Sequence, residues 1–285
     1  MSISEVEAIA IADRLRAWTG IRLDSGKTEL LRRRLTRRMR EVGLTKVKQY
    51  LALVDESRQE RENFINLLTT NETQFFRTAR VWSYLESEFL PAWQPPVKRS
   101  LRIWSAACSS GEEVYSLAML CADWQERHPL FDYALWASDI DSERVAQSRA
   151  AQYSGRAEAF LRERRPGWAE RFATPGPSGI TVLPKLKARA DFRVHNLLQP
   201  WTGPKDMDLV LLRNVLIYFA DPEFLQTLCH VWDAMAPQAV LILGESESLS
   251  HQKENLRARG KHFAYLAPQI YRKVLSPASS DDSHA

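Results

Sequence analysis

The first 70 or so residues carry apolar side chains at helical spacing. Ile9, Leu15 and Trp18 follow one helical face, and Gly20 can end that helix. A second helix is predicted through KTELLRRRLTRRMREVG, and the segments KVKQYLALV and RENFINLL continue the pattern. No stretch alternates as a strand would. We therefore predict a small all-α domain over residues 1–78.

The pattern changes after PAWQPPVKRS, a proline-rich connection. The apolar runs LRIWSAA, YALWASDID, MDLVLLRNVLIYF and AVLILGES suit strands, and helical stretches such as GEEVYSLAMLCADWQERH and PEFLQTLCHVWDAM separate them. This alternation predicts an α/β domain with a parallel sheet over residues 79–278. Residues 164–192 interrupt it with Pro, Gly and charge, which indicates a small inserted β-subdomain or a loop. The tail, residues 279–285, is expected to be disordered.

Composition narrows the class of protein. The chain has 285 residues, of which 45% are hydrophobic, so it can bury a sizeable core. Three widely separated cysteines lack zinc-ligand spacing and indicate reduced thiols, so we expect a cytoplasmic protein without a metal. No apolar run reaches the roughly 18 residues of a membrane span. The acidic start MSISEVEAIA is unlike a signal peptide.

The net charge of +4 is unevenly distributed. Between Lys27 and Arg40 a run of arginines faces a single acidic residue, Glu29. Such a block either forms a solvated helix face or meets an acidic partner. Nucleic acid is the less favoured partner, because no aromatic residues are interleaved with the arginines for stacking on bases.

Small residues connect the first predicted strand to its helix in IWSAACSSGEEVYSLA. Ligands of open α/β sheets bind at such turns, at the carboxyl ends of strands. The single glycine does not match the GxGxxG pattern, and Glu112 and Glu113 at the helix start would repel a pyrophosphate. The turn favours a ligand with cationic character. The alternative is an ordinary turn with a capping box formed by Ser109 and Glu112.

Two further strand ends carry polar side chains that suit a nucleoside. Asp139 ends YALWASD and can accept hydrogen bonds from both ribose hydroxyls, whereas Asp141 is the better helix cap. Asn196 follows DFRVH and can either pair with an adenine edge or form an Asx-turn.

Charged and aromatic residues next to apolar runs complete the candidate site. Arg213 and Asn214 directly follow an apolar strand, so Arg213 must reach solvent, a partner or a ligand. In NETQFFRT, Arg77 follows two phenylalanines, which we expect to pack at the junction of the two domains.

The strings TTNETQFFR, WSAACSSGEEVYSLA, ASDID, NLL, RNVLIYF and GESESL occur in this order. Together they resemble the chemotaxis receptor methyltransferases of the CheR family, which methylate receptor glutamates with S-adenosylmethionine. The resemblance extends to about Val274. It implies a Rossmann-like class I S-adenosylmethionine-dependent methyltransferase domain with a small inserted β-subdomain, preceded by an all-α N-terminal domain. The family's usual GHSE is GESE here, with Glu245 in place of the histidine.

The resemblance also implies an activity and its residues. The chain is expected to be a protein-glutamate O-methyltransferase that yields a glutamate methyl ester and S-adenosylhomocysteine during chemosensory adaptation. Arg77 and Tyr218 are implied near the reacting centre, where we expect Tyr218 to orient the acceptor carboxylate. The implied cofactor contacts are Asn71, Thr73, Arg77, Glu113, Asp139, Asn196, Leu197, Arg213 and Asn214.

The implied partner is the glutamate-rich methylation helix of a chemoreceptor, recognised by Arg34, Arg37 and Arg40. The insert is a candidate site for a receptor's C-terminal tether peptide, and a monomer is expected. Two alternatives remain open at this point. One is a non-catalytic adaptor that binds S-adenosylmethionine in a chemosensory complex, and the other is a methyltransferase for nucleic acid or small molecules.

Overall fold

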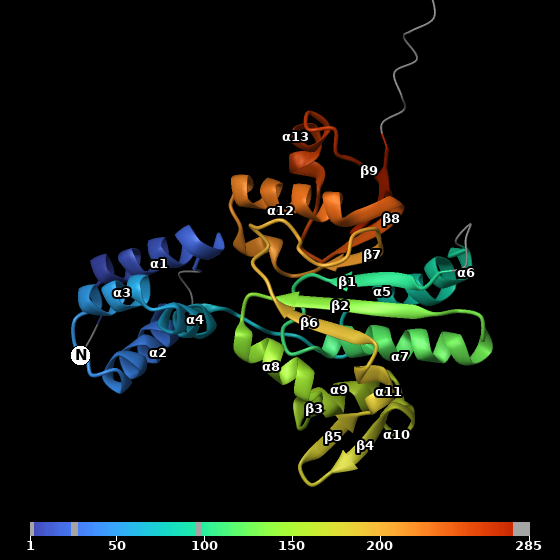
Figure 1. The fold of residues 1–285 in the computed structure, drawn as a ribbon, viewed down its shortest axis with the longest axis horizontal. Helices are drawn as coiled ribbons and strands as arrows, with labels where there is room; N and C mark the ends of the chain where they lie inside the picture. Colours follow the sequence, from blue (N-terminus) through green and yellow to red (C-terminus); the bar gives the residue numbers. More distant parts are fainter. Residues whose placement is uncertain (1–2, 24–27, 95–98, 276–285) are drawn as a thin grey trace, which may run out of the picture.

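The computed structural model describes residues 3–23, 28–94 and 99–275, and the predicted disordered tail lies outside these ranges. Four helices form the N-terminal part of the chain (Figure 1). Leu15, Phe64 and Tyr50 are fully buried in its core, as are residues of every one of the four helices. The helices are α1 (Glu5–Thr19), α2 (Thr28–Glu41), α3 (Val47–Glu56) and α4 (Arg58–Leu68).

Local signals set the ends of α1. The Ser4 side chain and Glu7 form a reciprocal capping box at its start. Gly20, with φ 75°, ends it in the left-handed region, as predicted. The sequence placed Ile9 on the buried face of α1, but Ile9 is 56% exposed and Ile11, two positions later, is buried instead.

The second part of the chain contains a seven-stranded sheet of order β6-β2-β1-β7-β8-β10-β9. Strands β6, β2, β1, β7 and β8 are parallel, and β10 runs antiparallel to both of its neighbours. The strands are β1 (Leu101–Ser105), β2 (Tyr133–Asp139), β6 (Ala190–Val194), β7 (Met207–Leu212), β8 (Met235–Leu243), β9 (His262–Ala267) and β10 (Ile270–Val274).

Helices cover both faces of this sheet (Figure 1). Every residue of β7 is buried: Leu209 and Leu211 point into one core, and Val210 and Leu212 into the other. This explains the continuous apolar run of MDLVLL, which a one-sided strand would not need. The first core includes α5 (Ala79–Tyr84) and α7 (Glu112–Arg127), and the second includes α12 (Asp221–Ala234) and α13 (Lys253–Arg257).

A small antiparallel sheet of order β3-β5-β4 forms the inserted subdomain, drawn below the main sheet in Figure 1. The strands do not coincide with the predicted range 164–192. The subdomain begins at β3 (Gln152–Tyr153), which is too short for a visible alternation, and residues 190–192 belong to β6 of the main sheet. Its other elements are α9 (Arg156–Arg164), α10 (Trp168–Phe172), β4 (Ala173–Gly176), β5 (Gly179–Val182) and α11 (Pro184–Lys187).

The sequence predicted that Phe75 and Phe76 pack at the domain junction, and this prediction is wrong. Both are buried in the core shared by the main sheet and the insert. Phe75 contacts Tyr153 edge-to-face at 4.9 Å between ring centroids, and Phe76 contacts Trp82 at the same centroid distance. The segment that follows α4 is therefore anchored in the second domain.

Helix α8 (Ser142–Ala150) buries Val145 in the first core. The π-helix η2 (Leu85–Phe89) and α6 (Leu90–Ala92) continue α5, and η3 (Leu216–Tyr218) and η4 (Ser250–Gln252) are 3-10 turns. Within the described ranges, no helix is both long and apolar enough to cross a membrane, and no three His, Cys, Asp or Glu residues gather as a metal site would require.

Candidate functional site

A cavity of about 260 Å³ lies where β1, β2, β6 and β7 end, next to the N-terminal helices. Residues 19–23 and 68–74 form one wall, and turns after the four strands form the other. All ten residues predicted as cofactor or catalytic residues line it, although they are spread over 148 positions from Asn71 to Tyr218. Arg34, Arg37 and Arg40 do not line it.

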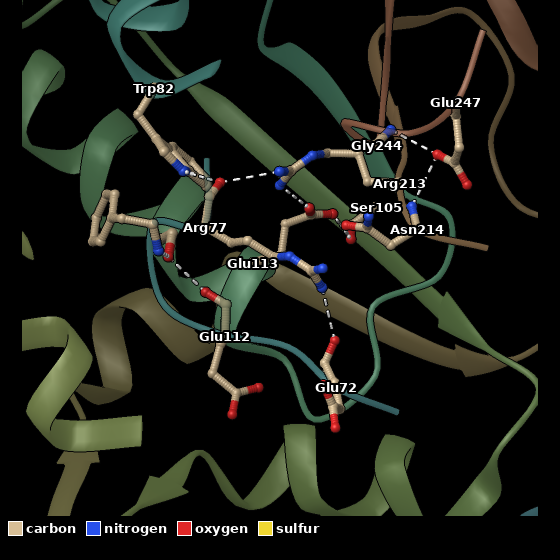
Figure 2. Close-up of polar contacts among 12 residues, drawn as sticks. Glu72, Arg77, Trp82, Ser105, Glu112, Glu113, Arg213, Asn214, Gly244 and Glu247 are labelled. Atoms are coloured by element: carbon tan, nitrogen blue, oxygen red, sulfur yellow. Dashed lines mark hydrogen bonds and ion pairs between the residues drawn. The ribbon is translucent and has the colours of Figure 1, made fainter. Parts of the chain in front are cut away.

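A buried ion pair lies at the floor of the cavity (Figure 2). Arg213 Nη1 donates to Glu113 Oε2 at 2.8 Å, and the side chains are only 3% and 11% exposed. Ser105 Oγ donates to the other carboxylate oxygen of Glu113 at 2.8 Å. The pair joins the end of β1, the start of α7 and the end of β7, so it ties three elements of the site together.

Arg213 also holds the segment that carries Arg77 (Figure 2). The carbonyl of Arg77 accepts from Arg213 Nη2 at 3.0 Å and from Trp82 Nε1 at 2.9 Å. Arg77 Nη1 donates to the carbonyl of Glu72 at 3.0 Å, which curls the guanidinium back over its own loop. Arg77 therefore reaches the cavity from a loop that is fixed at both ends.

Asp139 is buried at the end of β2 and faces the cavity. Its carboxylate accepts from the backbone N–H of Ser109 at 2.8 Å and of Asp141 at 3.0 Å. Burial raises the pKa of this carboxyl to about 6, and the backbone N–H groups of Asp141 and Ser109 partly oppose that shift. Each oxygen keeps a lone pair that can accept a hydroxyl from a ligand.

Asp141 connects the two domains. Its Oδ1 caps α8 by accepting from the N–H groups of Glu143 and Arg144, as the sequence suggested. Its Oδ2 accepts from Asn71 Nδ2 at 2.6 Å and from Thr69 Oγ1 at 2.9 Å. Sequence reasoning found the cap but missed this second role, which fixes Asn71 at the edge of the cavity.

The predicted capping box of Ser109 and Glu112 does not form. Gly111, with φ 94°, precedes α7 without a side-chain cap, and a Cβ there would lie 2.9 Å from Tyr153 Oη. The Ser109 hydroxyl donates instead to the carbonyl of Asn71 at 3.0 Å. The left-handed backbone at Ser109, φ 48°, turns this hydroxyl away from the helix and toward the N-terminal segment.

Asn196 follows β6 and adopts the Asx-turn that was one of its two interpretations. Its Oδ1 accepts from the N–H of Leu198 at 3.0 Å, and its Nδ2 donates to the carbonyl of Trp18 at 2.6 Å. The side chain therefore links β6 to the end of α1. Asn196 and Leu197 both line the cavity, and Leu197 is buried.

Glu247 is a buried carboxylate beside the site that the sequence analysis did not single out. It is 3% exposed, and its carboxylate accepts from the N–H groups of Gly244 at 2.6 Å and Asn214 at 2.9 Å (Figure 2). It also accepts from the N–H of Ile217 at 3.3 Å. Burial raises the pKa of its carboxyl. Glu245, the residue that replaces the family's usual histidine, is exposed. Glu247 thus holds the turn after β7, where Asn214 has φ 59°.

The segment after α1 closes the site over Tyr218. The N–H of Arg22 donates to the carbonyl of Tyr218 at 2.9 Å, and Arg22 Nη2 donates to the carbonyl of Phe219 at 3.1 Å. Tyr218 ends η3 and lines the cavity. The N-terminal domain is therefore hydrogen-bonded to the turn that carries the predicted catalytic tyrosine.

The polar groups that line the cavity match an adenosine attached to a positively charged amino acid. A ribose can use the accepting Asp139 carboxylate, and the Glu113 carboxylate suits a positive charge better than a phosphate. Among described side chains, the buried Nε of Arg213 and Nε2 of His195 have no hydrogen-bond partner, and both residues line the cavity. These unpartnered atoms provide polar contacts that a ligand can complete.

The arginines of α2 divide into two groups. Arg34 Nη1 donates to the carbonyl of Leu67 at 3.1 Å, and Arg38 binds the buried carboxylate of Glu60 at 2.6 Å, so both serve the helical domain. Arg37 is 73% exposed in a 3.6 Å pair with Glu41, and Arg40 is also exposed. Of the predicted substrate contacts, Arg37 and Arg40 are thus the ones that face solvent.

Six strands run in one direction, antiparallel β10 lies between β8 and the edge strand β9, and a cavity lies at the carboxyl ends of the parallel strands. This is the architecture of a class I S-adenosylmethionine-dependent methyltransferase. Two family models match the chain: "CheR methyltransferase, all-alpha domain" at residues 7–69 and "CheR methyltransferase, SAM binding domain" at residues 71–264. The chain belongs to the CheR methyltransferase family. The predicted family, fold class and cofactor are confirmed.

Two chemotaxis protein methyltransferases are similar to this chain over most of its length. A chemotaxis protein methyltransferase of Escherichia coli is 32% identical over 270 residues, which cover 92% of this chain and 91% of that protein. One of Klebsiella aerogenes is 34% identical and covers 85% and 83% of the two chains. The solved magnesium protoporphyrin IX methyltransferase of Synechocystis with bound S-adenosylmethionine is 12% identical, with a TM-score of 0.38 and coverage of 96% and 97%.

Proposed function

We propose that this protein transfers a methyl group from S-adenosylmethionine to glutamate side chains of a chemoreceptor, which gives glutamate methyl esters and S-adenosylhomocysteine. The single observation that carries the proposal is the cavity between the two CheR-family domains, in which the ten predicted residues converge. The names of the curated relatives, chemotaxis protein methyltransferases, support a chemoreceptor as the substrate.

The cofactor, when bound, supplies a methyl group on a positively charged sulfur. We assign Asp139 to the ribose hydroxyls, and Glu113 with Arg213 to the amino-acid end, where carboxylate and guanidinium match an ammonium and a carboxylate. Asn71 and Thr73 belong to the N-terminal wall of the cavity, and Asn214 lies beside Arg213. We assign Asn196 and Leu197 to the part of the cavity that holds the adenine.

The acceptor needs no general base. A glutamate side chain, with a reference pKa near ~4.3, is already ionised at neutral pH. The protein must align it and remove its water, and alignment alone can lower the barrier by roughly 7–11 kcal/mol. We assign Tyr218 to orient one carboxylate oxygen and Arg77 to steer the acceptor or hold the cofactor's carboxylate. Strong binding of the acceptor carboxylate by these side chains would stabilise the ground state more than the transition state and would slow the reaction.

Transfer of a labelled methyl group to receptor fragments tests the proposal. The purified chain is incubated with methyl-labelled S-adenosylmethionine and candidate receptor fragments. Label that mild base releases as methanol identifies a carboxyl ester. Label that resists base contradicts the ester, and cofactor binding without transfer to any receptor favours a non-catalytic adaptor.

Replacing Tyr218 with phenylalanine is expected to lower kcat about 10-fold, since a lost orienting hydrogen bond is worth ~1 kcal/mol or slightly more. The affinity for S-adenosylhomocysteine should stay within about twofold of wild type, because the ring is retained. Calorimetry and the labelling assay measure the two quantities. Unchanged turnover would remove Tyr218 from the mechanism.

Adenosine affinity is expected to fall as the pH drops through about 6. The pKa of the Asp139 carboxyl is raised to about 6, so below that pH the residue is protonated and loses acceptor capacity for the ribose. Binding that requires the ionised form weakens about tenfold per pH unit there and is constant above about pH 7. Calorimetric titration with adenosine measures this. Asp139→Asn should bind weakly at every pH, and a flat wild-type profile would contradict the assignment.

The Michaelis constant for the receptor fragment is expected to rise severalfold in Arg37→Ala/Arg40→Ala, since each exposed contact is worth about 0.2–1 kcal/mol. Raising the salt concentration should shrink the difference from wild type. Arg58→Ala is the matched control, because Arg58 is 92% exposed on another helix. Equal Michaelis constants in wild type and the double variant would leave the arginines as a solvated face.

The proposal also covers a receptor tether peptide, the oligomeric state and the cellular compartment. The insert's β4 is an edge strand of its sheet, and such an edge can pair with an extended receptor tether peptide. We further infer a monomer that acts in the cytoplasm. The three unpaired cysteines suit a reducing compartment.

A further inference from the structure

A second cavity, of about 400 Å³, lies between the 248–257 segment and strands β9 and β10. Within residues 3–23, 28–94 and 99–275, no residue lines both this cavity and the cofactor cavity. Its volume falls in the range typical of sites for small molecules. The assigned methyl-transfer chemistry makes no use of it.

The walls of this second cavity are apolar and aromatic. Leu249 and Leu256 form part of one side, and the rings of Phe263, Tyr265 and Tyr271 form the other. Tyr265 is 64% exposed and meets Tyr271 edge-to-face at a centroid distance of 6.0 Å. A large aromatic side chain exposed beside a cavity offers a face on which a flat ring can stack.

The rim of the second cavity is cationic. Lys253, Arg257 and Lys261 line it, and none of the described residues that line it is acidic. Lys261 is held by an ion pair with Asp233. For Lys253 and Arg257, both exposed, no carboxylate lies within ion-pair distance in the described part of the chain. Two cations one helical turn apart on α13 can bind one multivalent anion.

We propose that this second cavity binds a small anion that carries an aromatic ring, of the nucleotide class. The base stacks against Tyr265, and the phosphate is bound by Lys253 and Arg257. The hydroxyl groups of Ser248 and Ser250, hydrogen-bonded to each other at 2.8 Å, also line the cavity, as does Gln269, whose Oε1 accepts from Arg80. Their remaining hydrogen-bonding groups can contact the sugar. A ring without charge would leave the cations unused, and a bare phosphate would leave the aromatic wall unused.

Calorimetric titration of the full chain with guanosine 5′-monophosphate tests the proposal. The protein is first saturated with S-adenosylhomocysteine, so that the cofactor cavity cannot accept the nucleotide. The nucleotide is expected to bind at least tenfold more tightly than guanosine or inorganic phosphate. Affinity no better than that of inorganic phosphate would overturn the proposal, and so would tighter binding of an aromatic acid such as 4-hydroxybenzoate.

Variants locate the binding. Lys253→Ala/Arg257→Ala and, separately, Tyr265→Ala are expected to weaken nucleotide binding at least tenfold and to leave the affinity for S-adenosylhomocysteine unchanged. These side chains are exposed, so their removal does not threaten the core. Arg259→Ala is the matched control, because Arg259 is an exposed cation of the same segment that does not line the cavity. Nucleotide binding that is unaffected by the first two variants would contradict the site.

Discussion

Replacing Arg213 with methionine is expected to lower the free energy of unfolding by about 3–5 kcal/mol and to abolish methyl transfer. The change leaves the Glu113 carboxylate buried without its cation, which is far more costly than losing a surface pair. It also removes a donor from the carbonyl of Arg77. Urea denaturation and the labelling assay measure the two effects.

A matched surface variant and a double-mutant cycle complete this experiment. Arg162→Met breaks solvent-exposed ion pairs with Glu158 and Glu170 and should leave the free energy of unfolding close to that of wild type. Adding Glu113→Gln to Arg213→Met removes the uncompensated charge, so the double variant should be more stable than the sum of the single effects predicts. Strict additivity would mean that the two side chains do not interact.

Replacing Glu247 with alanine is expected to lower the free energy of unfolding by about 3 kcal/mol or more and turnover by roughly 100-fold. Three backbone N–H groups lose their acceptor, at about 1–3 kcal/mol for each one left buried and unsatisfied. The turn that carries Asn214 and Tyr218 then shifts, and displacements of about 1 Å can cost about 10²-fold in rate.

Two variants sharpen the role of Glu247. Glu245→Ala, two positions earlier and exposed, should leave stability and turnover near wild type. Glu247→Gln should be intermediate, because one oxygen can still accept from Gly244 and Asn214 while the bond to Ile217 is lost. If Glu245→Ala were the more damaging change, the acceptor would have been misassigned.

The sequence places polar residues at strand ends, and parallel strands present their carboxyl ends on one edge of a sheet. Asp139 ends β2, Asn196 follows β6 and Arg213 follows β7, so this rule brings all three to one cavity. Glu113, at the start of α7, lines the same cavity, but the sequence did not predict its ion pair with Arg213. Periodicity and strand order therefore carry most of the fold and the outline of the site.

What the sequence could not predict depends on partners distant in the chain. GESES holds two glutamates, and only the path of the turn after β8 decides that Glu247 is buried while Glu245 is exposed. The second oxygen of Asp141 bonds Asn71, 70 residues earlier, which no local pattern reports. The capping box of Ser109 and Glu112 does not form because the left-handed backbone of Ser109 turns its hydroxyl toward the carbonyl of Asn71.

The hydrogen bonds between the two domains have a consequence for recombination. Asn71 reaches Asp141, Asn66 reaches Ser142, and the Arg22 N–H reaches the carbonyl of Tyr218. A chimera that exchanges the helical domain with a relative's, to redirect the enzyme to another receptor, must therefore transfer or match these contact residues as one block. A crossover placed between α4 and Asn71 would separate Asn66 and Asn71 from each other while leaving their acceptors together. A cut after Thr78 keeps Asn66 and Asn71 on one side, and Phe75 and Phe76, which are buried in the first core of the sheet domain, must then be matched as well.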